Sequence, residues 1–179
     1  MISIKTSFKN ILLLSSVFVF SLGYAQRAPE SPKTSFSKEA LAEGLTSKAG
    51  SKTTIGAVLE KYKGKILVID FWASWCQDCI LALPKTQEIK DTYPQVDFVY
   101  FSLDRSYEQW NRGLVKYKME SWDHYWFDQG WKNHFNNYIE LNWVPRFIVV
   151  DQTSNIALYY AISPEDPNFV AVLERLTNE

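Results

Sequence analysis

The sequence has 179 residues, of which 46% are hydrophobic and 22% are charged. This length and mixture are typical of one globular domain with short appendages, and they exclude disordered, collagen-like and coiled-coil chains. The formal net charge of -1 shows no basic excess, so we expect no nucleic-acid partner. Two cysteines are too few for a disulfide-stabilised miniprotein or for a zinc site with four thiolates.

The first 25 residues have the pattern of a secretory signal peptide. Lys5 and Lys9 precede an apolar run at 11–22, and small residues at 23 and 25 fit a cleavage site before Gln26. The apolar run is shorter than the about 20 residues that a membrane-spanning helix needs, which disfavours a permanent N-terminal anchor. We therefore expect an exported protein, located in the periplasm, in which exposed thiols oxidise unless they are re-reduced.

The globular domain is predicted to span 51–179, after an N-terminal arm. Residues 26–50 are rich in Ser, Lys, Ala, Gly and Pro, which indicates a linker with one short helix near 37–43. A capped helix is predicted over 54–62. The run at 65–71 is continuously apolar up to its Asp and contains β-branched residues, as in strands that are buried on both faces of a sheet.

The rest of the chain alternates between helix-like and strand-like patterns. In order, we predict a helix after Cys76 that is kinked at Pro84, a strand at 96–103, a helix at 106–118, a short strand at 122–127, a helix at 130–140, strands at 144–151 and 156–162, and a final helix from residue 167. The turn-like sequence between the last two strands predicts an antiparallel hairpin. This order is typical of an α/β fold whose mixed sheet is flanked by helices.

The two cysteines, Cys76 and Cys79, are separated by two residues and follow a predicted switch from strand to helix. The thiolate is the form that attacks a disulfide, and the free amides and dipole of a helix N-terminus lower the pKa of a cysteine. A second thiol one helical turn later lies within reach to resolve the mixed disulfide. The pair is therefore predicted to be a redox centre that needs no other cofactor.

Three other roles fit this cysteine pair less well. A structural disulfide that closes so short a loop would add only about 2 kcal/mol to the free energy of unfolding. A metal site would require His124 and His134 as further ligands, and their separation is outside the usual spacing of such pairs, so we expect no bound metal. A cysteine–histidine hydrolase would leave the second cysteine without a role.

Two segments carry a resemblance to a known family. Phe71-Trp-Ala-Ser-Trp-Cys-Gln-Asp-Cys79 resembles the active-site segment of the thioredoxin superfamily, and Val144-Pro145-Arg-Phe-Ile-Val-Val-Asp151 resembles the segment in which thioredoxins carry a cis-proline. The predicted signal peptide, Lys63-Gly-Lys65 and the long insert before Pro145 narrow this to the exported TlpA/ResA-like thiol-disulfide oxidoreductases. The resemblance covers about residues 52–177. It implies a thioredoxin-like fold with an extra helix and strand inserted before the cis-proline strand.

The resemblance also implies roles for residues of the site. Cys76 would be the exposed attacking thiol and Cys79 the resolving thiol. Pro145 would form a wall beside Cys76, and the backbone of Val144 would be free to pair with an extended substrate. Trp75 would offer a flat apolar contact surface next to the dithiol.

Two acidic residues complete the predicted site. Asp70 matches the acid that thioredoxins place beneath the resolving cysteine, where burial would raise its pKa and let it accept the Cys79 proton, with Lys65 as a nearby charge partner. Asp78 stands where many relatives carry proline. The helix dipole favours an acid there, but this acid should also raise the pKa of Cys76 and make the disulfide less oxidising.

The resemblance therefore implies a monomeric, exported reductase of disulfides in partner proteins. A membrane-bound thiol donor would re-reduce it, and its substrates would include apocytochrome cysteines. The alternatives are an oxidase or isomerase that works in the other direction, or a non-enzymatic module that binds thiols or metal. Because the mature chain has no third cysteine, donor and acceptor should both dock at one face. Most aromatic residues at 104–143 should pack the insert onto the sheet, and a minority could line a recognition groove.

Overall fold

A seven-stranded mixed sheet lies at the centre of the computed structural model, which describes residues 28–178. In chain order the elements are α1 (Lys38–Leu41), β1 (Gly44–Ser47), β2 (Lys52–Thr54), α2 (Ile55–Glu60), β3 (Ile66–Trp72), α3 (Gln77–Thr92), β4 (Val96–Ser102), α4 (Tyr107–Lys116), β5 (Asp123–Trp126), α5 (His134–Tyr138), β6 (Arg146–Val150), β7 (Ile156–Ala161) and α6 (Pro167–Thr177). The predicted signal peptide lies outside the described residues. Among the residues described, no helix combines the length and apolar character needed to cross a bilayer.

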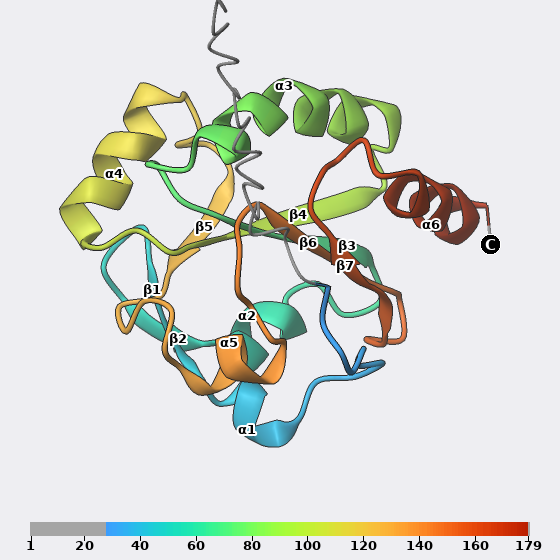
Figure 1. The fold of residues 1–179 in the computed structure, drawn as a ribbon, viewed down its shortest axis with the longest axis horizontal. Helices are drawn as coiled ribbons and strands as arrows, with labels where there is room; N and C mark the ends of the chain where they lie inside the picture. The colour runs from blue at the N-terminus through green and yellow to red at the C-terminus, as the bar shows by residue number, and fades with distance from the viewer. Residues whose placement is uncertain (1–27, 179) are drawn as a thin grey trace, which may run out of the picture.

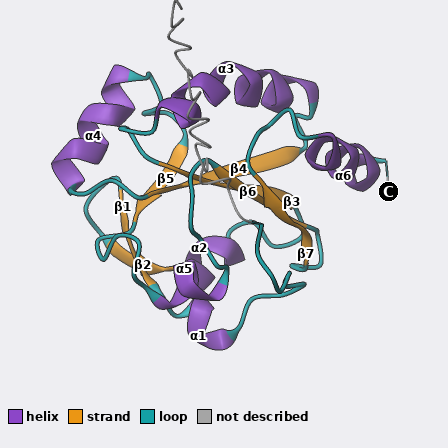
Figure 2. Ribbon diagram, viewed as in Figure 1, coloured by secondary structure: helices purple, strands orange, loops and turns teal. Residues whose placement is uncertain are grey.

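The strands follow the order β2-β1-β5-β4-β3-β6-β7 across the sheet. Strands β3, β4 and β5 are parallel to one another. At one side of them β6 pairs antiparallel with β3, and β7 pairs antiparallel with β6. At the other side β1 pairs antiparallel with β5, and β2 pairs antiparallel with β1. Helices α3, α4 and α6 cover one face of the sheet, and α1, α2 and α5 cover the other (Figures 1 and 2). The predicted α/β fold with a mixed sheet between helices is therefore confirmed, and β5 and α5 form the insert before β6.

Strand β3 leads to the cysteine pair from the middle of the sheet, and all its residues are buried. Because side chains alternate along a strand, its neighbours point to opposite helix layers. Phe71 stacks on Phe135 of α5, with ring centroids 6.1 Å apart. Asp70 faces the other layer, since its register partner Tyr100 lies beneath Lys90 of α3. A polar side chain is thus placed inside the layer that also carries the cysteines.

The predicted arm at 26–50 differs from the observed structure, because its last part belongs to the sheet. Strand β1 pairs with β2 and with β5, and Leu45 is buried in the core. Glu43, just before β1, accepts a 2.7 Å hydrogen bond from the backbone amide of His134. A strand of four residues with one large apolar side chain has too little periodicity to be distinguished from a loop, and its pairing with β5 is non-local.

Several predicted boundaries are confirmed with their local causes. Thr54 caps α2 by accepting a hydrogen bond from Ala57, and β6 and β7 form the predicted antiparallel hairpin. Helix α3 continues through Pro84 to Thr92, so the proline does not end it. The helix predicted over 130–140 is shorter than expected, because Asn133 caps α5 only at that point.

Candidate redox site

Cys76 is the N-cap residue of α3, as the switch from strand to helix predicts. Its Sγ accepts a 3.1 Å hydrogen bond from the backbone amide of Cys79, and the two residues are joined by a disulfide. The turn before the helix is closed by a 3.0 Å bond from the amide of Cys76 to the carbonyl of Ala73. A sulfur held at the free amides of a helix N-terminus is in the environment that stabilises a thiolate.

The residues before β6 form the opposite wall of the site. The Val144–Pro145 peptide bond is cis, as the resemblance implies. The carbonyl oxygen of Val144 lies 3.4 Å from Sγ of Cys76. Because β6 begins at Arg146, Val144 precedes the residues that pair with β3. The structure therefore brings Cys76, Cys79, Val144 and Pro145 together from two distant parts of the chain.

Cys76 is less exposed than the resemblance implies. Its residue exposure is 6%, close to the 3% of Cys79, whereas the adjacent Trp75 is 46% exposed. A cavity of about 380 Å³ opens beside the sulfur and is lined by Trp75, Cys76, Gln77, Asp78, Trp131, Asn142, Trp143 and Val144. A partner would thus have to enter between tryptophan side chains to reach Sγ. Trp131 and Trp143 come from the insert, whose role in the site the sequence left open.

Two further hollows adjoin the cavity beside Cys76 and share lining residues with it. One of about 370 Å³ extends from Asp78 and Trp143 past Pro145 to the segment 162–165, and another of about 350 Å³ extends from Cys76 to Lys116 and Tyr117. The large apolar side chains that are exposed in the described part each line a cavity at or next to the dithiol: Trp75, Leu81, Val115 and Trp143. A concentration of exposed apolar side chains on one face is typical of a protein-binding surface.

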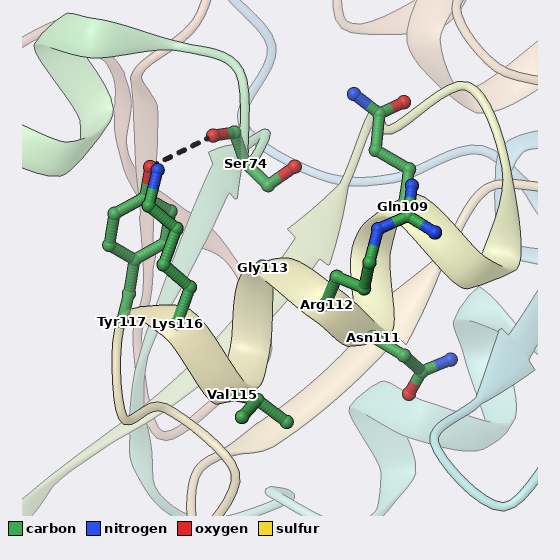
Figure 3. Close-up of a pocket in the computed structure, with 8 residues that line it drawn as sticks. All are labelled: Ser74, Gln109, Asn111, Arg112, Gly113, Val115, Lys116 and Tyr117. Carbon is green, nitrogen blue, oxygen red and sulfur yellow. Dashed lines mark hydrogen bonds between the residues drawn. The ribbon is translucent and has the colours of Figure 1, made fainter.

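A hollow of about 700 Å³ lies along α4 on the side of the dithiol that the sequence did not single out. Figure 3 shows its lining, with the hydroxyl of Tyr117 donating a 3.3 Å hydrogen bond to the carbonyl of Ser74. Arg112 and Lys116 place two cations along this hollow. It shares Ser74, Lys116 and Tyr117 with the hollow at Cys76, so the two are continuous. No motif marked this side, because α4 reaches it only through the packing of the sheet.

Asp70 is buried on β3, and one of its carboxylate oxygens has no hydrogen-bond partner. Burial raises the pKa of Asp70 to about 8, and the positive charge of Lys90 opposes that rise. The Nζ of Lys90 lies 3.9 Å from the ring centre of Trp122 and 5.6 Å from that of Tyr100. Lys65, which we expected near Asp70, instead forms a 3.0 Å ion pair with Asp97 at the other end of β3. The cation near Asp70 therefore comes from α3.

Asp78 lies in the first turn of α3 and is exposed. It lines both the cavity at Trp75 and the hollow that passes Pro145. Its position next to the attacking sulfur is as predicted, and its effect on the thiol stays a prediction.

The structure does not bring together the four residues of the alternative metal site. His124 is buried on β5 against Trp72 and Tyr100, with ring centroids 5.6 and 4.7 Å away. Burial lowers the pKa of His124 to about 3. His134 is exposed on α5, on the opposite face of the sheet. Within residues 28–178, no group of three or more His, Cys, Asp or Glu side chains is arranged to hold a metal ion.

Comparisons with known proteins agree with this geometry. Residues 64–156 match a family model described as thioredoxin-like. Thioredoxin-1 of Saccharomyces cerevisiae is 38% identical over 40 residues, which cover 22% of this chain and 39% of that protein. Thioredoxin H2 of Arabidopsis thaliana is 41% identical over 44 residues, covering 25% of this chain and 33% of that protein. The chain thus spans about two fifths or less of the length of these relatives.

Solved structures match over a larger part of the chain. A candidate thiol-disulfide oxidoreductase from Bacteroides vulgatus is 26% identical, with a TM-score of 0.61 over 74% of this chain and 90% of that one. A thiol-disulfide oxidoreductase from Bacteroides fragilis is 22% identical, with a TM-score of 0.63 over 78% of this chain and 99% of that one. A secreted Mycobacterium tuberculosis disulfide oxidoreductase is 18% identical, with a TM-score of 0.57 over 78% and 100% of the two chains. The last two likenesses establish the fold alone.

Proposed function

This chain belongs to the thioredoxin-like family, and from that premise we propose that it is a thiol-disulfide oxidoreductase. The observation that carries the proposal is the placement of Cys76 as N-cap of α3, with its Sγ on the amide of Cys79 and 3.4 Å from the carbonyl of Val144. A structural disulfide would not need a helix N-terminus, an adjacent cavity or two exposed tryptophans, Trp75 and Trp143, beside it. All three are requirements of a sulfur that partners must reach.

The reaction proceeds as a two-step exchange. The Cys76 thiolate attacks one sulfur of a partner disulfide, so that a Cys76–partner bond forms and the other partner sulfur leaves as a thiolate. Cys79 loses its proton and attacks Sγ of Cys76, which releases the second partner thiolate and forms the Cys76–Cys79 disulfide. The partner has gained two electrons and the enzyme has lost two. A donor dithiol then reverses these steps on the enzyme and becomes oxidised itself.

The direction that we propose is reduction of the partner. The carbonyl oxygen of Val144 places a partial negative charge 3.4 Å from Sγ of Cys76, and the carboxylate of Asp78 lines the same cavity, so both groups repel a thiolate. Both contacts oppose the stabilisation supplied by the Cys79 amide. A less stabilised thiolate makes the disulfide less oxidising. The competing direction, oxidation or isomerisation, requires a Cys76 thiolate that is strongly stabilised.

Asp70 is the proposed proton acceptor for Cys79 in the second step. Its burial beside β4 and its raised pKa suit a carboxyl that exchanges a proton near neutral pH. With a pKa of about 8, the acceptor form is the minor form at pH 7. Resolution by Cys79 should therefore accelerate as the pH rises towards 8.

The partners that we propose are proteins with an extended segment around the reacting disulfide. The backbone of Val144 would pair with that segment, and Trp75, Trp131 and Trp143 would pack on its side chains. Donor and acceptor would use this face in turn, because Cys76 and Cys79 are the only cysteines. Export to the periplasm, a membrane-bound donor and apocytochrome substrates extend this proposal and follow from the predicted signal peptide and the resemblance.

Reduction of insulin disulfides in the presence of dithiothreitol tests the activity directly. The wild-type protein should accelerate insulin precipitation, and Cys76→Ser should abolish the acceleration. Cys79→Ser should instead accumulate a mixed disulfide with its partners, which can be isolated and identified. If neither the wild type nor Cys76→Ser accelerated insulin precipitation, the result would favour a non-enzymatic module.

The reduction potential of the Cys76–Cys79 couple tests the direction. A value near the about -270 mV of thioredoxin would support a reductase, and a value near the about -120 mV of DsbA would assign the protein as an oxidase.

A further inference from the structure

A buried carboxylate holds the turn that precedes the dithiol. Asp104 follows β4 and is only 1% exposed. Its oxygens accept a 2.6 Å hydrogen bond from Oγ of Ser74 and bonds of 3.1 and 3.2 Å from the amide of the same residue. Ser102 donates a further bond of 2.8 Å from its hydroxyl. Because β3 and β4 are parallel neighbours, their carboxyl ends meet at one edge of the sheet, which brings Ser74 and Asp104 together.

Ser74 is held on its remaining sides by α4. The hydroxyl of Tyr117 donates a hydrogen bond to its carbonyl (Figure 3). Together with the bonds to Asp104, the amide, side chain and carbonyl of Ser74 are all engaged by the segment 104–117. The backbone of α4 also packs directly on it at Gly113. A Cβ at that position would lie 2.3 Å from Cβ of Ser74, closer than two carbons approach without a shift.

The carboxylate is itself anchored to the structure around it. The carbonyl of Asp104 accepts a 2.8 Å bond from the indole of Trp126, and its amide donates a 3.0 Å bond to the hydroxyl oxygen of Ser102. The oxygens of a buried carboxylate need hydrogen-bond donors, and the amide and hydroxyl of Ser74 and the hydroxyl of Ser102 supply them here. Ser74 is thus bonded through its amide, its hydroxyl and its carbonyl, which is more than the closing of an ordinary turn requires.

We propose that Asp104 is a positioning residue for the redox reaction, because through Ser74 it holds the turn before Cys76 in place when the disulfide opens. This inference rests on the proposed function, since it concerns the difference between the two redox states. In the oxidised form, Cys76 is tied covalently to Cys79 and cannot leave the helix N-terminus. In the dithiol form that tie is absent, and the turn held by Asp104 keeps Sγ at the amide of Cys79.

The positioning role determines in which direction the equilibrium between the dithiol and the disulfide should shift when Asp104 is replaced. Loss of the contact between Asp104 and Ser74 should release Cys76 mainly in the reduced form, so that the reduced form becomes less stable relative to the disulfide. The disulfide should then become less oxidising, and the pKa of Cys76 should rise because its thiolate loses the helix amide. Direct electrostatics would act in the opposite direction. Removing a nearby negative charge would stabilise the thiolate and make the disulfide more oxidising.

Two variants separate these effects. Asp104→Asn removes the charge and weakens the bonds to Ser74, whereas Ser74→Ala removes the shortest of the bonds without changing any charge. The control is Asp151→Asn, a carboxylate that holds the turn between β6 and β7 through the amides and hydroxyl of 153–155. The measurements are the equilibrium constant for exchange with glutathione and the pKa of Cys76, together with thermal unfolding of the oxidised and reduced full-length proteins.

The exchange equilibrium should shift towards the disulfide form by about five- to tenfold in both Asp104→Asn and Ser74→Ala, the change equivalent to the net contribution of one hydrogen bond. Asp151→Asn should lose stability equally in both redox states and keep the wild-type equilibrium. An unchanged equilibrium in both site variants would overturn the proposal and assign Asp104 a structural role. A shift towards the dithiol in Asp104→Asn alone would overturn it in favour of direct electrostatics.

Failure of the proposed function gives a different result. If the wild-type disulfide did not exchange reversibly with glutathione, or lay at the potential of an oxidase, the reductase proposal would fail irrespective of Asp104. The ratio of variant to wild-type equilibrium constants does not depend on where the wild-type potential lies, and in Ser74→Ala it carries no change of charge. If the Asp104→Asn variant does not fold, the ratio of exchange equilibrium constants can be measured with Ser74→Ala, which perturbs the structure less.

Discussion

The carbonyl oxygen of Val144 lies 3.4 Å from Sγ of Cys76, while the amide nitrogen of Cys79 lies 3.1 Å from the same sulfur. The amide donates to a thiolate or a thiol, whereas the carbonyl can only accept from a protonated thiol. The sulfur is thus placed between one group that favours its ionised form and one that favours its neutral form. Any charge added beside it shifts this balance.

Asp78→Asn should therefore lower the pKa of Cys76 and raise the reduction potential of the pair. The carboxylate lies in the first turn of α3 and lines the cavity at Cys76, so its removal relieves repulsion of the thiolate. We expect a potential that is about 10–30 mV higher, which corresponds to roughly a two- to tenfold change in the exchange equilibrium. Thiolate absorbance against pH and equilibration with glutathione measure the two quantities. Glu60→Gln, an exposed acid on α2, is the control, and no change in either quantity in Asp78→Asn would contradict the prediction.

Asp70→Asn should stabilise the folded protein above about pH 4 and slow its turnover. Because burial raises the folded-state pKa of Asp70 to about 8, the folded protein binds this proton more tightly than the unfolded chain does. The wild type therefore loses stability as the pH rises from about 4 to 8, and the variant lacks that loss. The difference should reach the order of several kcal/mol at pH 8, as measured by urea unfolding at a series of pH values.

The same variant should change the kinetics of resolution. In the wild type, the release of partner from the mixed disulfide should accelerate with pH through about 8, and Asp70→Asn should lose that dependence. Stopped-flow measurement of mixed-disulfide decay separates this step from the initial attack. An unchanged pH dependence would exclude Asp70 as the acceptor.

Lys90→Met should move the pH dependence of resolution to higher values. The positive charge of Lys90 lowers the pKa of Asp70 against the effect of burial, and its removal leaves burial unopposed. Tyr100 and His124 also face this region from β4 and β5, but both are uncharged at neutral pH, because burial raises the pKa of Tyr100 and lowers that of His124. The midpoint of the pH–rate profile should rise, and Lys90→Arg should keep the wild-type midpoint. Lys85→Met, on the same helix but paired with Glu88, should leave the midpoint in place.

Gly113→Ala should destabilise the protein by about 1–3 kcal/mol, the usual cost of overpacking. The added Cβ would meet Ser74 at 2.3 Å, so α4 or the turn before Cys76 must move. Gly44→Ala is the matched control, since a Cβ there meets no atom within 4 Å. Thermal or urea unfolding of both variants checks the difference. Equal stabilities would show that α4 can move away from Ser74 without cost.

The central strand, the helix after Cys76 and the hairpin before α6 could all be predicted from local sequence patterns. These elements have strong periodicity, clear caps or a turn-like connection, and each can be recognised within about a dozen residues. Strand β1 could not be recognised in this way. Its four residues are stabilised by pairing with β5, nearly eighty positions later, and that pairing leaves no local signal.

The residues that carry the proposed chemistry could also be identified from the sequence, because the spacing of Cys76 and Cys79 and the Val144–Pro145 pair are local features. The groups that surround these residues could be identified only once the fold was known. The cation near Asp70 comes from α3 instead of the start of β3, and the turn before Cys76 is held by a carboxylate at the end of β4. Parallel strands bring their carboxyl ends to one edge of the sheet, and the position of each helix on the sheet is set by side-chain packing. The neighbours of a reactive group are therefore set by contacts between residues that are far apart in the chain.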